Sequence, residues 1–136
     1  MPPVDYHEIR GHFRLGTVKI VDEELQSRIS LKKQVSRDED IAIRKCVSEA
    51  IMTISEEARI SPTKLHYLFW NIFRTVCLRQ NALCGNEAYS SALVNRYRHL
   101  LSVATEEVGC PFCKLCEASG RRELQFTEHL FDTDWY

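Results

Sequence analysis

Hydrophobic residues recur every three or four positions through the middle of the chain, which is the period of an amphipathic helix. In residues 38–59 this stripe consists of Ile43, Val47, Ala50, Ile51, Ile54 and Ala58. Ser36 or Asp38 can cap the start of such a helix, because the side-chain oxygen accepts from a backbone N–H of the first turn. The pattern predicts a helix that begins near residue 38 and ends near Arg59.

Two further helices are predicted after this one, each with its own start and stop signals. Ser61 and Pro62 supply an N-cap and a first helical residue, and Gly85 is a suitable residue for the helix end. Asn86 can begin the third helix, and Gly109 can end it. Amphipathic helices joined by short links favour antiparallel packing. We therefore expect a mainly α-helical protein built as an antiparallel bundle of three to four helices.

The N-terminal part of the chain has a weaker pattern. Residues 1–11 are expected to be irregular, whereas residues 12–21 are rich in β-branched side chains that partly alternate, as in a short strand or hairpin. Residues 22–35 are expected to contain a helix with Leu25 and Ile29 facing inward. The chain is accordingly divided into an N-terminal segment (1–37), a helical bundle (38–109) and a cysteine-rich tail (110–136).

The composition is that of an ordinary globular protein. Hydrophobic residues make up 44% of the chain and charged residues 27%, and the net charge is −1, whereas a general nucleic-acid binder usually has a basic excess. No apolar run approaches the ~18 residues needed to cross a bilayer, and residues 1–5 lack the features of a signal peptide. We expect a cytoplasmic protein, or a nuclear one if the host has a nucleus, whose six cysteines are thiols or metal ligands rather than disulfides.

Three cysteines stand at double C-x2-C spacing immediately after the third predicted helix. In a tight turn, the thiolates of Cys110, Cys113 and Cys116 can converge on one point, and backbone N–H groups of the turn can bond to the sulfurs. This arrangement is typical of a metal site. It predicts a cysteine-rich metal-binding knuckle that holds zinc.

Zinc requires a fourth ligand, and the spacing favours His129. The run Cys113-x2-Cys116-x12-His129 resembles the first three ligands of C2H2 zinc fingers, and the tail that contains His129 has to fold back over the knuckle. Cys84 is disfavoured, because a continuous third helix of about 22 residues would separate it from Cys110 by roughly 33 Å. The expected ligands are therefore Cys110, Cys113, Cys116 and His129.

Two other uses of the cysteines stay open. The C-x2-C-x2-C run resembles the cluster-binding run of bacterial-type ferredoxins, which a distant Cys-Pro pair usually completes; here Cys-Pro lies inside the run. Residues 110–113, Cys-Pro-Phe-Cys, also resemble a thioredoxin-type redox site, although a helix precedes them and too few residues follow Cys116 for that fold. Cys46 and Cys77 are expected on or beside apolar helical faces, where cysteine behaves as a small hydrophobe.

Residues 54–69 resemble one helix-turn-helix of AraC-type transcription regulators. The matching features are Ala58, the Ile60-Ser61-Pro62 turn, Leu65, Leu68 and Phe69. The resemblance implies that the second helix enters the major groove of DNA. The residues that it would present to nucleic acid, or to another partner, are Thr63, Lys64, His66, Tyr67, Asn71 and Arg74. Arg59 replaces the small residue common in the family's turn, and the family's second helix-turn-helix has no counterpart here.

These features favour a small zinc-stabilised helical module that acts by macromolecular binding, as an adaptor or regulatory protein. A helix-turn-helix DNA-binding transcription regulator is the first alternative, and an iron–sulfur or thiol-redox protein is the second. An enzyme is disfavoured, because no phosphate-binding loop, HExxH motif or nucleophile elbow is present. Because the net charge is near zero, a protein partner or homo-oligomer is favoured over nucleic acid, and no membrane partner is expected.

Overall fold

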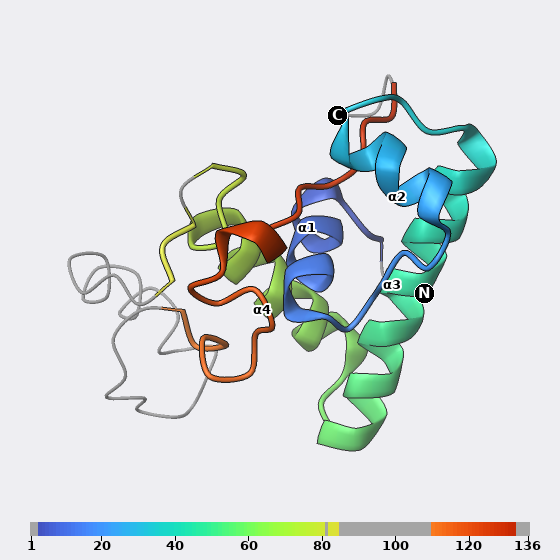
Figure 1. Ribbon diagram of the computed structural model, residues 1–136. Coiled ribbons are helices and arrows are strands. Elements are labelled where there is room, and N and C mark those ends of the chain that lie inside the picture. The colour runs from blue at the N-terminus through green and yellow to red at the C-terminus, as the bar shows by residue number, and fades with distance from the viewer. Residues whose placement is uncertain (1–2, 81, 85–109, 133–136) are drawn as a thin grey trace.

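Residues 3–80, 82–84 and 110–132 of the protein are described by a computed structural model. Within these residues the chain is mainly helical and contains no β-strand, which confirms the predicted α-helical class for the described part (Figure 1). The elements are α1 (Tyr6–Leu15), α2 (Glu23–Ser30), α3 (Arg37–Ala58), α4 (Pro62–Thr75) and a short 3-10 helix, η1 (Arg122–Leu124). None of the described helices is long and apolar enough to span a membrane.

The two central helices form where the hydrophobic pattern predicted them. Helix α3 begins at the N-cap Ser36, whose hydroxyl accepts from the backbone N–H of Glu39, and it ends at Arg59 in the left-handed conformation. Helix α4 begins at the N-cap Ser61, but it ends at Thr75, well before the predicted end at Gly85. The third predicted helix, residues 86–109, lies outside the described residues, so the antiparallel bundle stays a prediction.

The predicted strand over residues 12–21 and the irregular segment over residues 1–11 are wrong, because α1 occupies much of both. A capping box starts α1: the Asp5 carboxylate accepts from the backbone N–H groups of His7 and Glu8, and the Glu8 carboxyl group accepts from the Asp5 N–H. Gly16 ends the helix with φ at 85°, a left-handed conformation that suits glycine. The helix was missed because charged side chains interrupt its apolar stripe.

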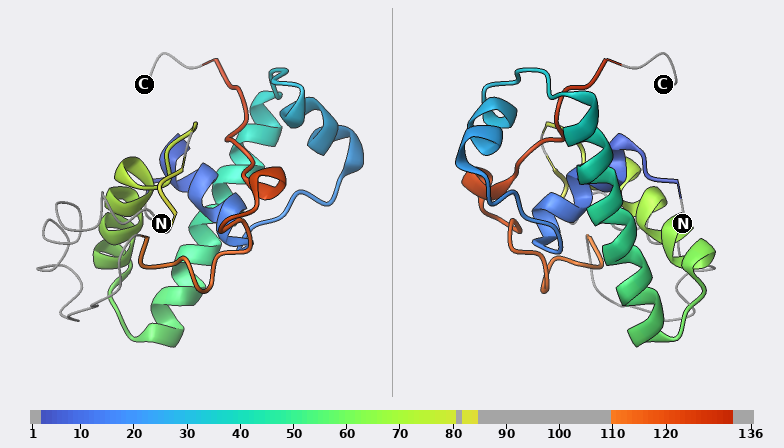
Figure 2. Two further views of the ribbon diagram at one scale, coloured as in Figure 1. Left: turned by 60° about the vertical axis from the view of Figure 1, so that its left-hand side comes forward. Right: turned by 90° about the vertical axis from the view of Figure 1, so that its right-hand side faces the viewer.

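Helix α1 is central to the packing, because α1, α3 and α4 each contact the other two. The core that they share includes Ile9, Phe13, Ile43, Val47, Ile51, Phe69, Ile72 and Phe73. Gly11 is required at its position, because a Cβ atom there would lie 2.2 Å from the Phe73 ring. Helix α2 lies at the side of this core, and it contributes the buried Ile29 while Leu25 is half-buried (Figure 2).

The C-terminal residues run along α1 and reach the start of α3 (orange to red in Figure 1). An isolated parallel bridge joins Gln34 to Leu130, and the Val35 N–H donates to the Leu130 carbonyl at 3.0 Å. The tail is therefore attached to the loop between α2 and α3 as well as to α1.

Four polar side chains of α1 are as deeply buried as its apolar ones. Glu8 and His12 are 0% exposed, and Arg10 and Arg14 are 2% exposed. Burial raises the pKa of Glu8 to about 8 and lowers the pKa of His12 to about 3, so both side chains are mainly neutral at pH 7. A protonated Glu8 can donate to Nδ1 of His66 on α4, which lies 2.7 Å from its Oε1 atom.

Replacing Glu8 by glutamine tests this burial through the pH dependence of stability. The unfolded chain releases the Glu8 proton near the ordinary value of 4.5, whereas the folded protein holds it until about pH 8. Glu8 therefore contributes to the free energy of unfolding of the wild-type protein at low pH, and this contribution is lost as the pH rises from about 4.5 to about 8. The Glu8→Gln protein escapes that loss, so its stability relative to wild type should increase across the same range and then level off.

Urea unfolding at a series of pH values measures the difference directly. Glu57→Gln, at an exposed position near the end of α3, is the matched control and should give a difference that changes little with pH. A Glu8→Gln difference that stays constant from pH 4 to 9 would show that Glu8 is not protonated in the folded protein.

Candidate metal site

Five of the six cysteines line one small cavity in the structure. They are Cys77 and Cys84, which follow α4, together with Cys110, Cys113 and Cys116. The cavity has a volume of about 20 Å³, which is room for roughly one water-sized particle. All six cysteines are free thiols, and the sixth, Cys46, is exposed on α3. The cysteines near the two ends of the undescribed residues 85–109 are thus brought together.

The segment with the three C-terminal cysteines is a series of tight turns docked on α4. The N–H of Cys113 donates to the Cys110 carbonyl at 3.0 Å, and the N–H of Cys116 donates to the Phe112 carbonyl at 2.8 Å. The Phe112 ring packs against the rings of Phe69 and Phe73, with centroids 5.6 and 6.0 Å apart. This aromatic contact places the turns beside the end of α4.

The chain after α4 turns back toward the same cavity. The Leu83 N–H donates to the Val76 carbonyl at 3.0 Å, which closes a turn and returns Cys84 to the neighbourhood of Cys77. On the other side, the Arg14 carbonyl accepts from the Cys116 thiol at 3.2 Å and from the Ala118 N–H at 3.1 Å. The cavity therefore lies between α1, the segment after α4 and the cysteine turns.

The Arg14 side chain forms one wall of this cavity and binds the chain on both sides of it. Its guanidinium group donates to the carbonyl oxygens of Leu78 at 2.6 Å, Arg79 at 3.1 Å and Phe126 at 2.8 Å. It also donates to the Cys77 sulfur at 3.3 Å. Within the described residues Arg14 has no carboxylate partner, so a buried positive charge lies next to the thiols.

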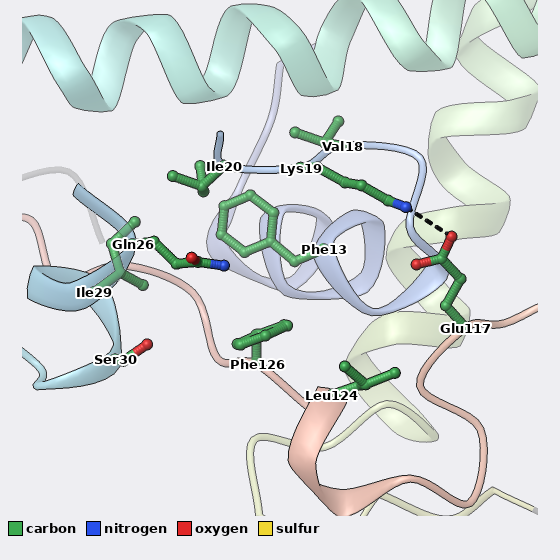
Figure 3. A pocket seen from close by; sticks show the side chains of 10 residues that line it. All are labelled: Phe13, Val18, Lys19, Ile20, Gln26, Ile29, Ser30, Glu117, Leu124 and Phe126. Atoms are coloured by element: carbon green, nitrogen blue, oxygen red, sulfur yellow. Dashed lines mark hydrogen bonds and ion pairs between the residues drawn. The ribbon is translucent and has the colours of Figure 1, made fainter. Parts of the chain in front are cut away.

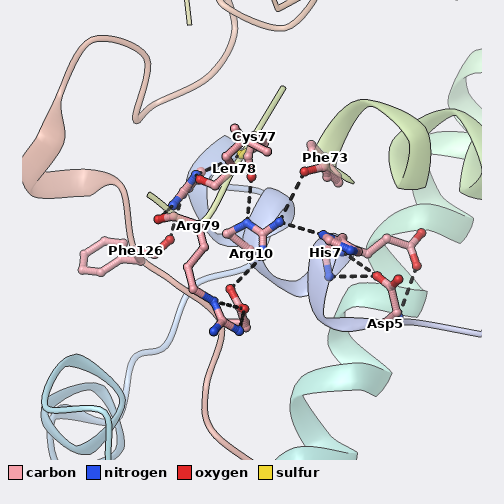
Figure 4. A network of polar contacts seen from close by, with 11 residues as sticks. Asp5, His7, Arg10, Phe73, Cys77, Leu78, Arg79 and Phe126 are labelled. Atoms are coloured by element: carbon pink, nitrogen blue, oxygen red, sulfur yellow. Dashed lines mark hydrogen bonds and ion pairs between the residues drawn. The ribbon is translucent and has the colours of Figure 1, made fainter. Parts of the chain in front are cut away.

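Arg10, one turn earlier on α1, makes a parallel set of contacts (Figure 4). It donates to the carbonyl oxygens of Cys77 at 2.7 Å and Phe73 at 3.3 Å, and it pairs with the buried Glu128 at 3.0 Å. Burial alone would raise the pKa of Glu128, but Arg10 and Arg79 outweigh it and hold the pKa below its usual value. Arg10 thus has a compensating carboxylate, whereas Arg14 has none among the residues that the structure describes.

Burial raises the pKa of the Cys110 thiol to about 12, and it also raises the pKa values of Cys84 and Cys116. Backbone amide groups act in the opposite direction on all three thiols. The amide of Phe112 lies near Cys110, that of Ala118 near Cys116 and that of Gly120 near Cys84. Amides that favour thiolates are a feature of metal–thiolate turns, where they bond to the sulfurs.

The structure places only three of the four expected zinc ligands at the cavity. Cys110, Cys113 and Cys116 share the cavity, but the expected fourth ligand His129 does not line it. Instead, Nε2 of His129 lies 2.6 Å from the Asp40 carboxylate at the start of α3, and its Nδ1 is buried without a partner in the described residues. Cys84, which was disfavoured, does line the cavity. Among the described side chains, no three of His, Cys, Asp or Glu converge closely enough to hold a metal ion.

The residues of the predicted helix-turn-helix form an exposed face on α4. Thr63, Lys64, Tyr67 and Arg74 are exposed. Two further residues of the predicted contact set, His66 and Asn71, make contacts within the protein instead. His66 is half-buried against Glu8, and the Asn71 side-chain amide donates to the Tyr67 carbonyl at 2.7 Å.

The exposed face of α4 contains two aromatic side chains, Tyr67 and Trp70. The rings of Tyr67 and Trp70 are stacked with centroids 6.4 Å apart, and the Arg74 guanidinium lies over the Trp70 ring at 4.8 Å. The Trp70 indole N–H donates to the Asp5 carboxylate at 2.7 Å, which fixes the ring beside a shallow hollow. The face therefore combines aromatic rings with charges of both signs.

A second cavity, of about 270 Å³, lies between α1, α2 and the tail (Figure 3). Its walls are mainly apolar and include Phe13, Val18, Ile20, Ile29, Leu124 and Phe126. Lys19 and Glu117 form an exposed ion pair of 2.9 Å at its edge. Sequence analysis missed this cavity, because its walls come from separate segments and none of them carries a motif.

Replacing Arg14 by lysine is expected to destabilise the protein by about 2–4 kcal/mol, because the carbonyl oxygens of Leu78, Arg79 and Phe126 would lose their donors in a buried place. Lysine keeps the charge, but its three N–H groups radiate from a single nitrogen atom and cannot reach carbonyl oxygens that are spread around the planar guanidinium group. Urea unfolding measures the change, and Arg74→Lys at an exposed position is the control. Equal stabilities for the Arg14→Lys protein and the wild type would mean that the guanidinium contacts do not hold this region.

Comparison of the chain with known protein families, with curated proteins and with solved structures found no match to any of them. The arrangement of the cysteines and of the exposed face of α4 is therefore the basis on which a function is assigned.

Proposed function

We propose that the protein is a zinc-stabilised helical module that acts by binding a macromolecule, as an adaptor or regulatory protein and not as an enzyme. The observation that carries this proposal is the gathering of five cysteines around one cavity of about 20 Å³. Cysteine thiolates are preferred zinc ligands. Rotation about the Cα–Cβ bond moves a cysteine sulfur without moving the backbone, so an entering ion can draw the sulfurs inward.

The size of the cavity favours a single zinc ion over an iron–sulfur cluster. An iron–sulfur cluster contains several iron and sulfide atoms, whereas the cavity has room for roughly one water-sized particle. The thioredoxin-type alternative is also less well supported, because residues 111–115 form turns here and not the start of a helix that follows a strand.

Zinc at this place would stabilise the fold by joining segments that are far apart in the sequence. The cavity is lined by α1, by the segment after α4 and by the cysteine turns. An ion that binds only when these segments are assembled adds its binding free energy to the stability of the folded state. In this proposal zinc has a structural role, and the partner binds at another surface of the protein.

The exposed face of α4 is the surface best suited to a partner. Tyr67 is 50% exposed and its ring stacks on that of Trp70. The Arg74 guanidinium group lies over the Trp70 ring. Tyrosine, tryptophan and arginine are the residues most enriched where proteins bind one another. A protein partner is favoured, because Asp5 borders this face and would repel the phosphates of a nucleic acid.

DNA binding is the second candidate, since Lys64 and Arg74 are exposed on the same helix. Two observations weigh against it. His66 lies against Glu8 and is not presented to the solvent as the family resemblance implied. Glu56 and Glu57 are exposed near the end of α3, and together with Asp5 they balance the charges of Arg59, Lys64 and Arg74. The surface therefore lacks the basic excess that phosphate binding requires.

Metal analysis tests the zinc proposal. Protein purified without added metal is expected to contain about one zinc ion per chain, and removal of zinc with a chelator should lower the midpoint of thermal unfolding. Cys113→Ser should abolish the bound zinc, whereas Cys46→Ser, at an exposed position away from the cavity, should retain it. A metal-free protein with unchanged stability and freely reacting Cys110, Cys113 and Cys116 would contradict the proposal.

A gel-shift titration with random duplex DNA separates the two kinds of partner. We expect no salt-sensitive binding at micromolar protein, because the acidic residues Asp5, Glu56 and Glu57 border the exposed face of α4. Micromolar binding that weakens as salt rises would reverse this preference if Lys64→Ala with Arg74→Ala abolished it. Lys33→Ala with Lys45→Ala removes the same charge from exposed positions outside α4 and serves as the matched control.

A further inference from the structure

We propose that Cys84, and not His129, completes the metal site, so that zinc is held by the four thiolates of Cys84, Cys110, Cys113 and Cys116. This inference rests on the proposed zinc function and specifies its ligands. It reverses the expectation drawn from sequence spacing, in which a long helix kept Cys84 away from Cys110.

The first argument is position. Cys84 lines the same cavity as the three C-terminal cysteines, and the hydrogen bond between Leu83 and Val76 holds the turn that places it there. Four sulfurs around a void the size of one particle match the tetrahedral coordination of structural zinc.

The second argument is that His129 is already bound elsewhere. Its Nε2 atom lies 2.6 Å from the Asp40 carboxylate, and Asp40 also pairs with Arg44 at 2.9 Å. The backbone next to His129 is held as well, because the neighbouring Leu130 carbonyl accepts from Val35. Movement of His129 into the cysteine cavity would break these contacts near the start of α3.

The third argument is charge. Arg14 is buried, borders the cavity and has no carboxylate partner among the described residues. A buried cation is costly unless an opposite charge lies near it. A zinc ion with four thiolates carries a net charge of about −2, whereas three thiolates and a neutral histidine leave about −1. The four-thiolate site therefore compensates the Arg14 charge more fully.

Cys77 also lines the cavity, but its position suits a supporting role. It directly follows the C-cap of α4, is buried, and its sulfur accepts a hydrogen bond from the Arg14 guanidinium at 3.3 Å. Cys84 lies in the turn after α4, lines the cavity and is less buried than Cys77. We therefore assign Cys84 as the ligand and Cys77 as a partner of Arg14.

Zinc-dependent protection of thiols tests the assignment on the unaltered, full-length protein. The protein is treated with iodoacetamide in the presence of zinc or after removal of zinc, and the modified cysteines are identified by mass spectrometry of peptides. Zinc is expected to slow the alkylation of Cys84 together with that of Cys110, Cys113 and Cys116. Cys46 is exposed and should react equally fast in both samples.

Zinc affinity of variants gives a second measurement, made by competition with a chromophoric chelator. Cys84→Ser should weaken zinc binding by about 100-fold or more, since loss of a ligand costs at least as much as loss of one of its outer partners. His129→Gln can keep a hydrogen bond to Asp40, and it should bind zinc as the wild type does, as should the control Cys46→Ser.

The outcomes separate this inference from the proposed function. If the wild-type protein binds no zinc, both are wrong. If it binds zinc while Cys84 reacts at the same rate with and without the ion, or if His129→Gln weakens binding and Cys84→Ser does not, only the assignment of Cys84 is overturned. Protection of Cys84 in the wild-type protein supports the assignment even if the Cys84→Ser protein fails to fold.

Discussion

The described part of the protein depends on two buried guanidinium groups, those of Arg10 and Arg14 on α1. A helix can present charged side chains to the interior only if other parts of the chain supply their partners. Here the partners are the Glu128 carboxylate and the backbone carbonyl oxygens of Phe73, Cys77, Leu78, Arg79 and Phe126. These contacts hold segments with little regular structure, and they place the chain after α4 beside the cysteine turns.

The buried charged side chains of α1 also explain which helices could be predicted from the sequence. Helices α3 and α4 have apolar stripes of period 3.6 and N-caps at Ser36 and Ser61, so local patterns sufficed. Helix α1 could not be found by that criterion, because four of its buried side chains are titratable. The Asp5 and Glu8 pair of its capping box was the available local signal, but it stands in front of a sequence without a continuous apolar face.

The candidate site could be predicted in part for a similar reason. The spacing of Cys110, Cys113 and Cys116 is a local property, and the structure does bring them to one cavity. The position of Cys84 depends on a turn closed by Val76 and Leu83, and that of His129 depends on the distant Asp40 carboxylate at the start of α3. Neither can be inferred from spacing, because the path of the chain between two ligands is set by what each segment packs against.

The contacts of Arg10 and Arg14 also have a consequence for the synthesis of the protein on the ribosome. The partners of these two residues extend to Phe126 and Glu128, more than a hundred positions later in the sequence. Until those residues emerge, α1 must either keep its guanidinium groups in water or bury them with only the carbonyl partners from α4 and the segment after it. Incomplete pairing of a buried charge is costly. Native docking of α1 in the nascent chain is thus delayed until translation has passed residue 128, and contacts this distant in sequence also slow the folding of the completed chain.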